Sequence, residues 1–403
     1  MASSGSSSSS YRWVILGVGT SAQGVLAAVF VAVPVLAPAL RVEYHLSLHA
    51  VGGLLAAATG GQVLTQYVWG LLNDRFGERV VLAAGMGAGS VALVFAALTT
   101  RLLLIAVALV FAGMFATAVS AATGRAIMGW FEPGERGLAL GVRQTAVPAG
   151  GAVAAAALPF ALDRGGLGAS FFVLAGACAT VAVLGALLLR EPQVLAGQAE
   201  GAGADPLRDG RLWRLMAGGT LLIFVQAAFL AFVVLYLHVD RGLSTARAAA
   251  VLAAINIAGG GLRVWLGLRS DRRHVRLEPL SRVSLVIAAA SAATVGATTG
   301  SNVILIPVLF VAGAVAISWN GLLVAATAEL VGRTRTGTAL GLQQTALSAT
   351  VTVVGPAFAA IVTLTSWRTG FAFLAVLPLG AYLILRTLVP AERVRCANYG
   401  RPT

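Results

Sequence analysis

The stretch Gly137-Leu-Ala-Leu-Gly-Val-Arg-Gln-Thr-Ala-Val-Pro-Ala-Gly150 decides the architecture of this chain, because it occurs twice. It returns 200 residues later as Gly337-Thr-Ala-Leu-Gly-Leu-Gln-Gln-Thr-Ala-Leu-Ser-Ala-Thr350, with eight identities in fourteen positions. A second pair of motifs supports the repeat: Gly70-Leu-Leu-Asn-Asp74-Arg75-Phe-Gly77-Glu-Arg79 is matched by Gly267-Leu-Arg-Ser-Asp271-Arg272-Arg273. The chain is therefore expected to consist of two tandem copies of one unit.

The composition places most of this chain in lipid. Of the 403 residues 58% are hydrophobic and only 11% are charged, far from the values of soluble domains. The net charge of +13 does not indicate nucleic acid, because most arginines lie in the short gaps between apolar spans. There is no lysine, which argues against a P-loop ATPase. No metal-spaced His/Cys cluster and no nucleophile–base pair is recognisable, so we expect neither an enzyme nor a cofactor nor a bound metal.

A helix needs about 20 apolar residues to cross a bilayer, and the chain offers twelve such spans. The sequence predicts an all-α membrane protein with twelve transmembrane helices in two pseudo-symmetric six-helix halves. The expected spans are 13–40, 50–73, 79–99, 102–127, 137–161 and 169–189, then 214–238, 246–268, 280–299, 302–328, 337–364 and 369–389. The halves are 13–189 and 213–389, joined by a cytoplasmic linker at 190–212, with a disordered N-tail at 1–12 and a C-tail at 390–403.

The arginines predict the orientation. Nineteen lie on the side of both ends and the linker, against six on the other side. By the positive-inside rule both termini are expected in the cytoplasm, in a multi-pass protein of the inner (plasma) membrane. The remaining partners we expect are the lipid bilayer and a small-molecule substrate, with a monomer as the working state.

The signature Gly-x-x-x-Asp-Arg-x-Gly-x-Arg between spans two and three, its weaker copy between spans eight and nine, and the 6+6 arrangement resemble the major facilitator superfamily. The run from Ala122 to Pro148 is similar to its cyanate permease and nitrate/nitrite porter branches, as are the second-half run from Trp319 to Glu329 and the later pair Gly355-Pro356. That resemblance implies a transporter of small anions. The drug-antiporter signature in span five is incomplete, because its closing Gly-Pro is missing.

Arg263 is the first candidate for substrate binding. It lies eight residues before Asp271, which puts it about 12 Å into the membrane, where a charge costs about 2.5–3.5 kcal/mol. It resembles the span-eight arginine that grips the anion in monocarboxylate and nitrate/nitrite porters. The alternative is a structural role against a backbone carbonyl or Glu329. The equivalent first-half residue is Gln66, whereas nitrate porters carry an arginine in both halves, so a monovalent organic anion suits the site better.

Further polar and aromatic residues could line the same central cavity. The candidates are Asn256, Gln62, Gln226 and Trp319, each with the alternative of an interhelical contact. Arg143, whose repeat counterpart is Gln343, is a candidate second anion contact, although its depth favours a gate or a contact between the halves. Arg125 is expected to pair with an acidic loop residue such as Glu132 or Glu135.

The repeated signature predicts the gate. Asp74 is expected to accept hydrogen bonds from the start of span eleven near Gly337, and Asp271 from the start of span five near Gly137, where the helix dipole is positive. The gating group is completed by four further charged residues of the same side: Arg75, Arg79, Arg272 and Glu329.

The sequence therefore predicts a secondary active or facilitative transporter of a small organic or inorganic, monocarboxylate-like anion, working by alternating access. The alternative is proton-coupled efflux of amphipathic drugs, which would need an aromatic cavity and no dependence on Arg263. A receptor built on the same fold is a further alternative. Because the acids lie at or near the span ends, we expect exchange or facilitated diffusion rather than proton symport.

Overall fold

The computed structural model describes residues 5–46, 48–132, 134–190, 206–331, 335–390 and 392, and within these ranges every regular element is a helix. The elements are α1 (Gly5–Glu43), α2 (Leu48–Leu98), α3 (Leu102–Ala116), α4 (Ala118–Trp130), α5 (Arg136–Leu188), η2 (Pro206–Arg208), α6 (Gly210–Leu235), η3 (Tyr236–Asp240), α7 (Thr245–Arg273), α8 (Leu277–Ala297), α9 (Asn302–Ile317), α10 (Asn320–Val331), α11 (Thr336–Leu364) and α12 (Trp367–Leu385). The all-α prediction is confirmed.

The helices match the expected spans closely. Ten helical segments of the described residues are long and apolar enough to cross a membrane. Two of them contain a sharp backbone reversal: α2 at Gly77, with φ 79°, and α5 at Gly165 and Gly166, the latter with φ 68°. Glycine is the residue that adopts such positive φ values without strain. Dividing α2 and α5 at these glycines relates the ten segments to the twelve expected spans, and the count of twelve crossings stays a prediction.

Two local features differ from the sequence prediction. Helix α1 begins at Gly5, so residues 5–12 are helical rather than part of a disordered tail; a helix that is already formed extends at little cost through serine. The fourth and tenth spans are each broken, at Thr117 between α3 and α4, and at Ser318 and Trp319 between α9 and α10. The breaks fall at equivalent positions of the repeat, about 200 residues apart.

The chain divides into two compact units that follow the predicted halves with two exceptions. Unit 1 comprises residues 1–132, 142–206 and 331–348, and unit 2 comprises 133–141, 207–330 and 349–403. The first turns of α5 therefore belong to unit 2, and the first turns of α11 belong to unit 1. Each unit thus contains a short segment from the opposite half of the sequence.

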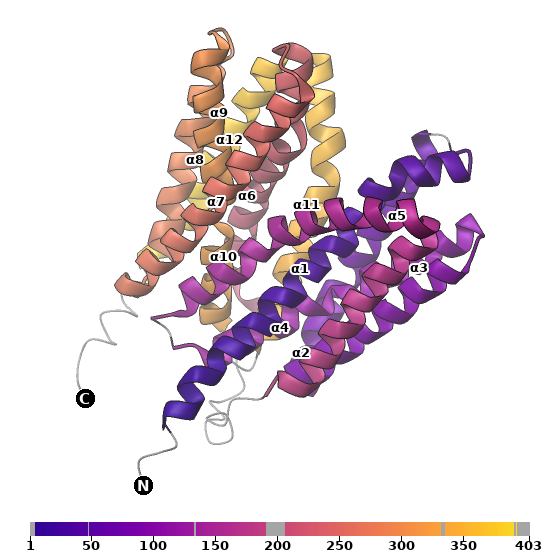
Figure 1. Ribbon diagram of the computed structural model, residues 1–403. Helices are drawn as coiled ribbons and strands as arrows, with labels where there is room; N and C mark the ends of the chain where they lie inside the picture. Colours follow the sequence, from indigo (N-terminus) through magenta and orange to yellow (C-terminus); the bar gives the residue numbers. More distant parts are fainter. Residues whose placement is uncertain are drawn as a thin grey trace, which may run out of the picture. The chain divides into compact units, whose positions relative to one another are not determined.

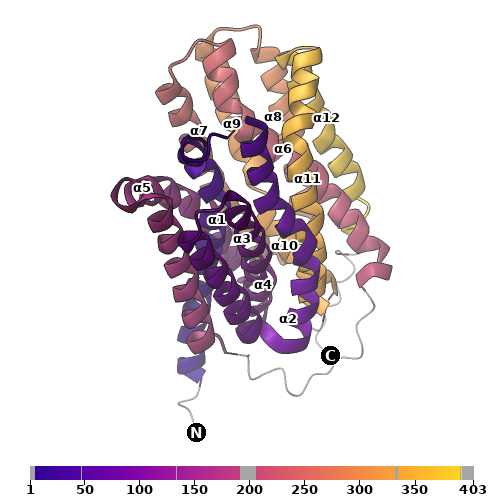
Figure 2. The ribbon, with the colours of Figure 1, turned by 90° about the vertical axis from the view of Figure 1, so that its right-hand side faces the viewer.

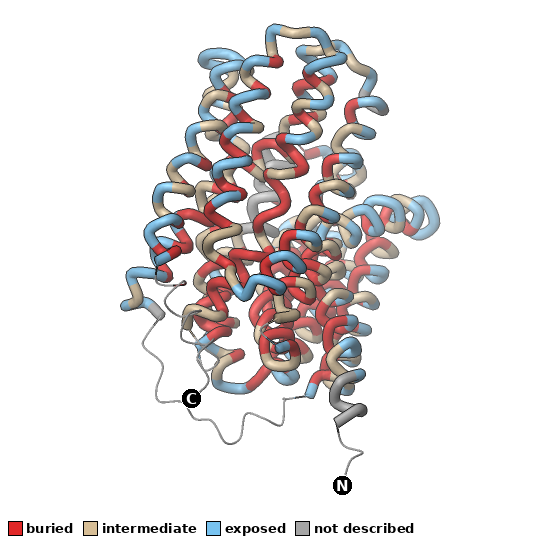
Figure 3. Tube along the Cα trace, turned by 90° about the vertical axis from the view of Figure 1, so that its left-hand side faces the viewer, coloured by how far each residue is buried: buried red, intermediate tan, exposed pale blue. Residues whose placement is uncertain are grey.

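Within unit 1, α2 packs against α3 and α4, and α4 also packs against α1 (Figure 2). Ile15, Leu36, Leu82 and Met86 are fully buried in this core. Within unit 2, α8 lies between α9 and α12, and α12 also contacts α6 (Figure 1). In both units buried residues line the inner faces of the helices, whereas exposed residues lie on their outer faces (Figure 3). In a bilayer those apolar outer faces contact lipid, so close packing rather than water exclusion holds each unit together.

Candidate functional site

Asp271, in the last turn of α7, holds the start of α5 in unit 2. Its carboxylate accepts hydrogen bonds from the backbone N–H groups of Gly137 (2.8 Å) and Leu138 (2.7 Å). These N–H groups belong to the first turn of α5, where they have no intrahelical acceptor and carry the positive end of the helix dipole. A buried carboxylate at this point is thus compensated by two charge-assisted bonds. We call Asp271, Gly137 and Leu138 the Asp271 latch.

Asp74, on α2, makes the equivalent contact in unit 1. It accepts from the backbone N–H of Gly337 (2.9 Å) and of Thr338 (2.7 Å), and from the Thr338 hydroxyl (2.5 Å). We call Asp74, Gly337 and Thr338 the Asp74 latch. Both contacts predicted from the repeated signature are present at the residues expected. Their role in gating remains a proposal.

Glycines on both sides of each latch let the two backbones touch. A Cβ atom added at Gly137 would lie 2.6 Å from the Gly267 carbonyl oxygen, and one at Gly337 would lie 2.8 Å from the Gly70 carbonyl oxygen. The reciprocal additions, at Gly267 and Gly70, would collide with the carbonyls of Gly137 and Gly337. Any larger residue would force the helices apart. The glycines common to the two signatures and the two repeated stretches are thus explained by close helix approach.

Arg276 reinforces the Asp271 latch, and the sequence analysis did not identify it. This buried guanidinium donates to the carboxylates of Asp271 (2.5 Å) and Glu329 (3.0 Å) and to the Ser270 hydroxyl (2.8 Å). Burial acts to lower the pKa of Arg276, but the attraction of Glu329 and Asp271 and their hydrogen bonds outweigh it and raise the pKa. Arg276 thus supplies the counter-charge for the buried Asp271 and for the partly buried Glu329.

Glu392, which the sequence assigned to the C-tail, caps α8. Its carboxylate accepts from the backbone N–H groups of Leu277 (2.9 Å) and Glu278 (3.1 Å), as well as from that of Arg276. The carboxylate satisfies first-turn donors and interacts favourably with the dipole of α8. The residues just after α12 are therefore tied to the loop that carries Arg276.

In unit 1 the ion pairs are arranged differently. Arg125, on α4, lies 3.8 Å from Asp74 and 3.6 Å from Glu78, and it also donates to the Asn73 carbonyl. The prediction that Arg125 pairs with Glu132 or Glu135 is wrong. Its guanidinium turns toward the signature on α2, because the carboxylates there are partly or fully buried and need a counter-charge.

Arg263 is buried, with 5% of its surface exposed, and lies on α7 two turns before the Asp271 latch. Its Nε and Nη2 donate to the carbonyl oxygen of Ile317, at 3.3 and 2.7 Å. Ile317 is the last residue of α9, so Arg263 satisfies a carbonyl freed by the break before α10. Gly141 packs against the backbone of Arg263, and Gly321 of α10 against its side chain. The sequence left open a structural role for Arg263 against either a backbone carbonyl or Glu329. The structure shows the contact with a backbone carbonyl, whereas Glu329 pairs with Arg276.

Arg143 is the buried guanidinium of unit 1, with 3% of its surface exposed. It donates to the Thr123 hydroxyl (2.7 Å), the Gln23 side-chain carbonyl (3.3 Å) and the Ser120 backbone carbonyl (3.5 Å). All three acceptors are neutral, and no carboxylate of the described part of the chain forms an ion pair with it. Its Nε and the Ser120 hydroxyl are buried without any hydrogen-bond partner. A permanent charge is therefore held in a polar but uncharged environment.

The other substrate-binding candidates divide between the units. Gln66 is buried and donates to the Ser348 hydroxyl at 3.1 Å, and Gln62 is partly buried on the same helix. In unit 2, Asn256 bonds to the Leu252 carbonyl of its own helix. The side-chain oxygen of Gln226 is buried without a partner.

Trp319 is fully buried, and its indole N–H donates to the Ala316 carbonyl at 2.9 Å, so it presents no open face to a substrate here. It fills the break between α9 and α10 instead. The three gating arginines Arg75, Arg79 and Arg272 are exposed, and the Arg75 guanidinium lies 5.2 Å from the centre of the Phe76 ring. None of the three takes part in the two latches as the structure describes them.

Comparison of the sequence with known protein families identifies the family of this chain. Residues 20–351 match the model of the Major Facilitator Superfamily. The chain belongs to this superfamily. It is 33% identical over 397 residues to an uncharacterized MFS-type transporter of Mycobacterium tuberculosis strain CDC 1551, covering 95% of this chain and 87% of the relative. A counterpart in strain H37Rv is 32% identical over the same length. The protein is therefore a membrane transporter and not an enzyme.

Solved structures show the same fold. A variant of the E. coli fucose:proton symporter FucP superposes with a TM-score of 0.72 at 14% identity, over 92% of this chain and 98% of that one. The proton:xylose symporter XylE gives 0.74 at 18% identity, over 95% and 96%. The human organic anion transporter MFSD10 gives 0.74 at 16% identity, over 93% and 99%. These identities establish the fold alone. The narrower likeness to the cyanate and nitrate/nitrite branches stays a prediction.

Proposed function

We propose that this transporter carries a small anion of the monocarboxylate type by alternating access. The observation that carries the proposal is Arg143, a buried arginine whose described partners are all neutral oxygens. A charged side chain within a membrane span costs about 2.5–3.5 kcal/mol even on lenient scales. The buried Arg276, by contrast, is neutralised by the carboxylates of Asp271 and Glu329. An uncompensated positive charge that is nevertheless retained is best explained by an anion that arrives from outside the chain.

Arg263 provides a second positive charge in the other unit. Its guanidinium presents five N–H donors in a planar fork. That fork matches a carboxylate in a bidentate arrangement. The two arginines are not repeat equivalents, since Arg143 corresponds to Gln343 and Arg263 to Gln66. Each half thus contributes one arginine and one glutamine, which favours a small anion over a neutral substrate.

The fold itself does not select the substrate. The neighbours named above are described as symporters of fucose and xylose and as an organic anion transporter. One framework therefore accommodates sugars and anions, and the choice depends on the side chains of the site. The proposal consequently rests on Arg143 and Arg263 rather than on likeness to any single neighbour.

We propose the two latches as the gate. Each one holds the start of a helix from the opposite half of the sequence, and both lie at the arginine-rich ends, which we place in the cytoplasm of an inner-membrane protein. Opening toward that side would have to release the helix starts at Gly137 and Gly337. Because both latches depend on short hydrogen bonds and on glycine contacts, they would open as discrete steps.

A thermal-shift screen tests the substrate class without requiring a transport assay. The purified protein is heated with small carboxylates (acetate, lactate, pyruvate, benzoate), with nitrate and cyanate, and with common amphipathic drugs. An anion at a hundredfold excess over its dissociation constant should stabilise the folded protein by about 2.7 kcal/mol. Arg143→Gln and Arg263→Gln each install the residue found at the equivalent repeat position, and both should abolish the stabilisation.

Arg211→Gln is the matched control, because Arg211 is exposed and pairs with Asp209 near the linker. It should leave the anion response unchanged. Stabilisation by drugs but by no anion would refute the proposed substrate class. An anion response that persists in Arg143→Gln would remove the observation on which the proposal rests.

A further inference from the structure

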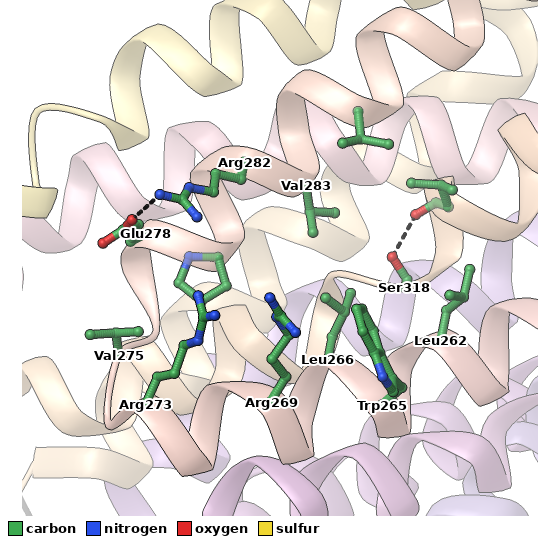
Figure 4. A pocket seen from close by; sticks show the side chains of 13 residues that line it. Leu262, Trp265, Leu266, Arg269, Arg273, Val275, Glu278, Arg282, Val283 and Ser318 are labelled. Atoms are coloured by element: carbon green, nitrogen blue, oxygen red, sulfur yellow. Dashed lines mark hydrogen bonds and ion pairs between the residues drawn. The ribbon is translucent and has the colours of Figure 1, made fainter.

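A cavity of about 450 Å³ lies in unit 2 between α7, α8 and the end of α9 (Figure 4). We propose that this cavity binds an anionic glycerophospholipid, with its phosphate among the arginines and an acyl chain along the apolar wall. The inference concerns neither the latches nor the proposed substrate arginines. It does not depend on which substrate is carried.

The cavity carries an excess of positive charge at one end. Its lining includes Arg269, Arg273 and Arg282 but a single acid, Glu278. Glu278 pairs with Arg282, while Arg269 and Arg273 form no ion pair with any carboxylate of the described residues. Three arginines against one glutamate leave a net charge of +2. In Figure 4 the side chains of Arg269 and Arg273 rise from α7 toward Glu278 and Arg282 of α8.

The charge gives way to an apolar wall deeper in the membrane. On α7, residues 273, 269, 265 and 262 follow one another at helical spacing along one face, so Leu262 lies about 16 Å from Arg273. On α8, Val286 lies one turn beyond Arg282 on the cavity side. Leu266, Val283 and Val315 add to this apolar wall. A charged rim followed by an apolar wall corresponds to the headgroup and acyl chain of a phospholipid.

Trp265 marks the boundary between the two zones. The residue is 52% exposed, and the Arg269 guanidinium lies 5.4 Å from the centre of its ring. Tryptophan is enriched where headgroups meet hydrocarbon, because its ring is apolar and its N–H is polar. A second, smaller cavity of about 190 Å³ shares Trp265, Arg269 and Arg273 and adds Arg272. The basic rim therefore extends around the end of α7.

The chemistry favours a lipid over a soluble anion. Val286 is 52% exposed, and it and its neighbours would gain nothing from an inorganic phosphate. Arginine binds phosphate through bidentate hydrogen bonds, and basic pockets between transmembrane helices bind anionic headgroups. A zwitterionic lipid has the same phosphate, but its amine leaves the charge of +2 uncompensated. The site should therefore prefer phosphatidylglycerol to phosphatidylcholine.

Native mass spectrometry of the detergent-purified full chain tests this preference. Phosphatidylglycerol and phosphatidylcholine with identical acyl chains are added at equal concentration, and the retained lipid is counted. Two arginines near a headgroup, at about 1 kcal/mol each, predict a preference of roughly tenfold or more for the anionic lipid. Arg269→Gln/Arg273→Gln should lose that preference, while Arg386→Gln, which removes another exposed arginine at the end of α12, should keep it.

Two further measurements keep the proposal open to refutation. Val286→Gln leaves the charges intact and should weaken lipid retention several-fold, whereas a site for free phosphate would be unaffected. The single variant Arg273→Gln serves if the double variant does not fold, and should lower the preference to an intermediate value. Equal retention of the two lipids by the wild type would overturn the proposal, as would an undiminished preference in both arginine variants. Displacement of the lipid by millimolar inorganic phosphate, with no effect of Val286→Gln, would identify a phosphate site instead.

Discussion

Replacing the glycines at the latches by alanine should open them. The Cβ of Gly137→Ala would lie 2.6 Å from the Gly267 carbonyl oxygen and 2.8 Å from the nearer Asp271 carboxylate oxygen. Ordinary contact begins near 3.5 Å, so the helices must separate by roughly 0.9 Å. Overpacking of this kind costs about 1–3 kcal/mol. Because the strain exists only while the latch is closed, the population of the open form should rise by about 5- to 150-fold.

Amide hydrogen exchange read by mass spectrometry measures this population without a known substrate. The Leu138 N–H is bonded to Asp271 while the latch is closed, so its exchange should accelerate in proportion to the open population. Gly337→Ala should act in the same way on Thr338, because its Cβ would lie 2.6 Å from Asp74. Each variant should accelerate amide exchange at its own latch more than at the other latch.

The same helices provide matched controls. Gly176 on α5 and Gly355 on α11 have no atom within 4 Å of an added Cβ. Gly176→Ala and Gly355→Ala therefore test the gain in helix propensity, about 1 kcal/mol, without a collision. They should leave exchange at Leu138 and Thr338 unchanged. The reasoning would be refuted if Gly137→Ala, folded and stable, showed the same protection at Leu138 as Gly176→Ala.

Three other predictions concern the charged residues. Arg263→Ala should abolish anion binding, and Arg263→Lys should retain little of it, because an ammonium cannot form the bidentate fork; near-normal affinity in a folded Arg263→Ala protein would contradict this. Asp74→Asn and Asp271→Asn should slow transport in liposomes while leaving substrate affinity within a few-fold, because the loss affects the equilibrium between states; unchanged rates in both would argue against the latches as gates. Uptake should not be driven by an imposed pH gradient, because the acids lie at span ends and Glu329 is paired with Arg276; gradient-driven accumulation that is lost in Glu329→Gln would show proton coupling.

The sequence predicted the fold because its strongest signals are local or repeated. Apolar spans and their separating charges are set by bilayer thickness, which allows little freedom. The two latches were predictable for a different reason. A motif that recurs at a fixed offset must make equivalent contacts in both copies, so the aspartate of one half was expected at the helix start of the other.

What the sequence could not predict depends on side-chain direction. Arg125 was expected to pair with nearby loop acids, but it turns to Glu78, 47 positions earlier in the chain. Glu392 lies in a stretch without a regular spacing of apolar residues, so nothing in the sequence distinguished it from the C-tail.

The helix breaks at Thr117 and Ser318 were missed for a different reason, because they lie in apolar runs that the sequence predicts as uninterrupted spans. A threonine or serine at equivalent repeat positions is the only signal that could have located them.

The two latches share their hydrogen bonds but not their counter-charges. In unit 1 the arginine comes from α4 and the extra acid, Glu78, from the signature. In unit 2 the two origins are exchanged: the acid, Glu329, comes from α10, and the arginine, Arg276, follows the signature. Both arrangements place an arginine beside the latch aspartate. The two copies therefore share the latch geometry, although the arginine and the second acid come from different elements in each copy. The closed contact therefore depends on a carboxylate facing a helix start across paired glycines, and the arginine beside it is a replaceable counter-charge.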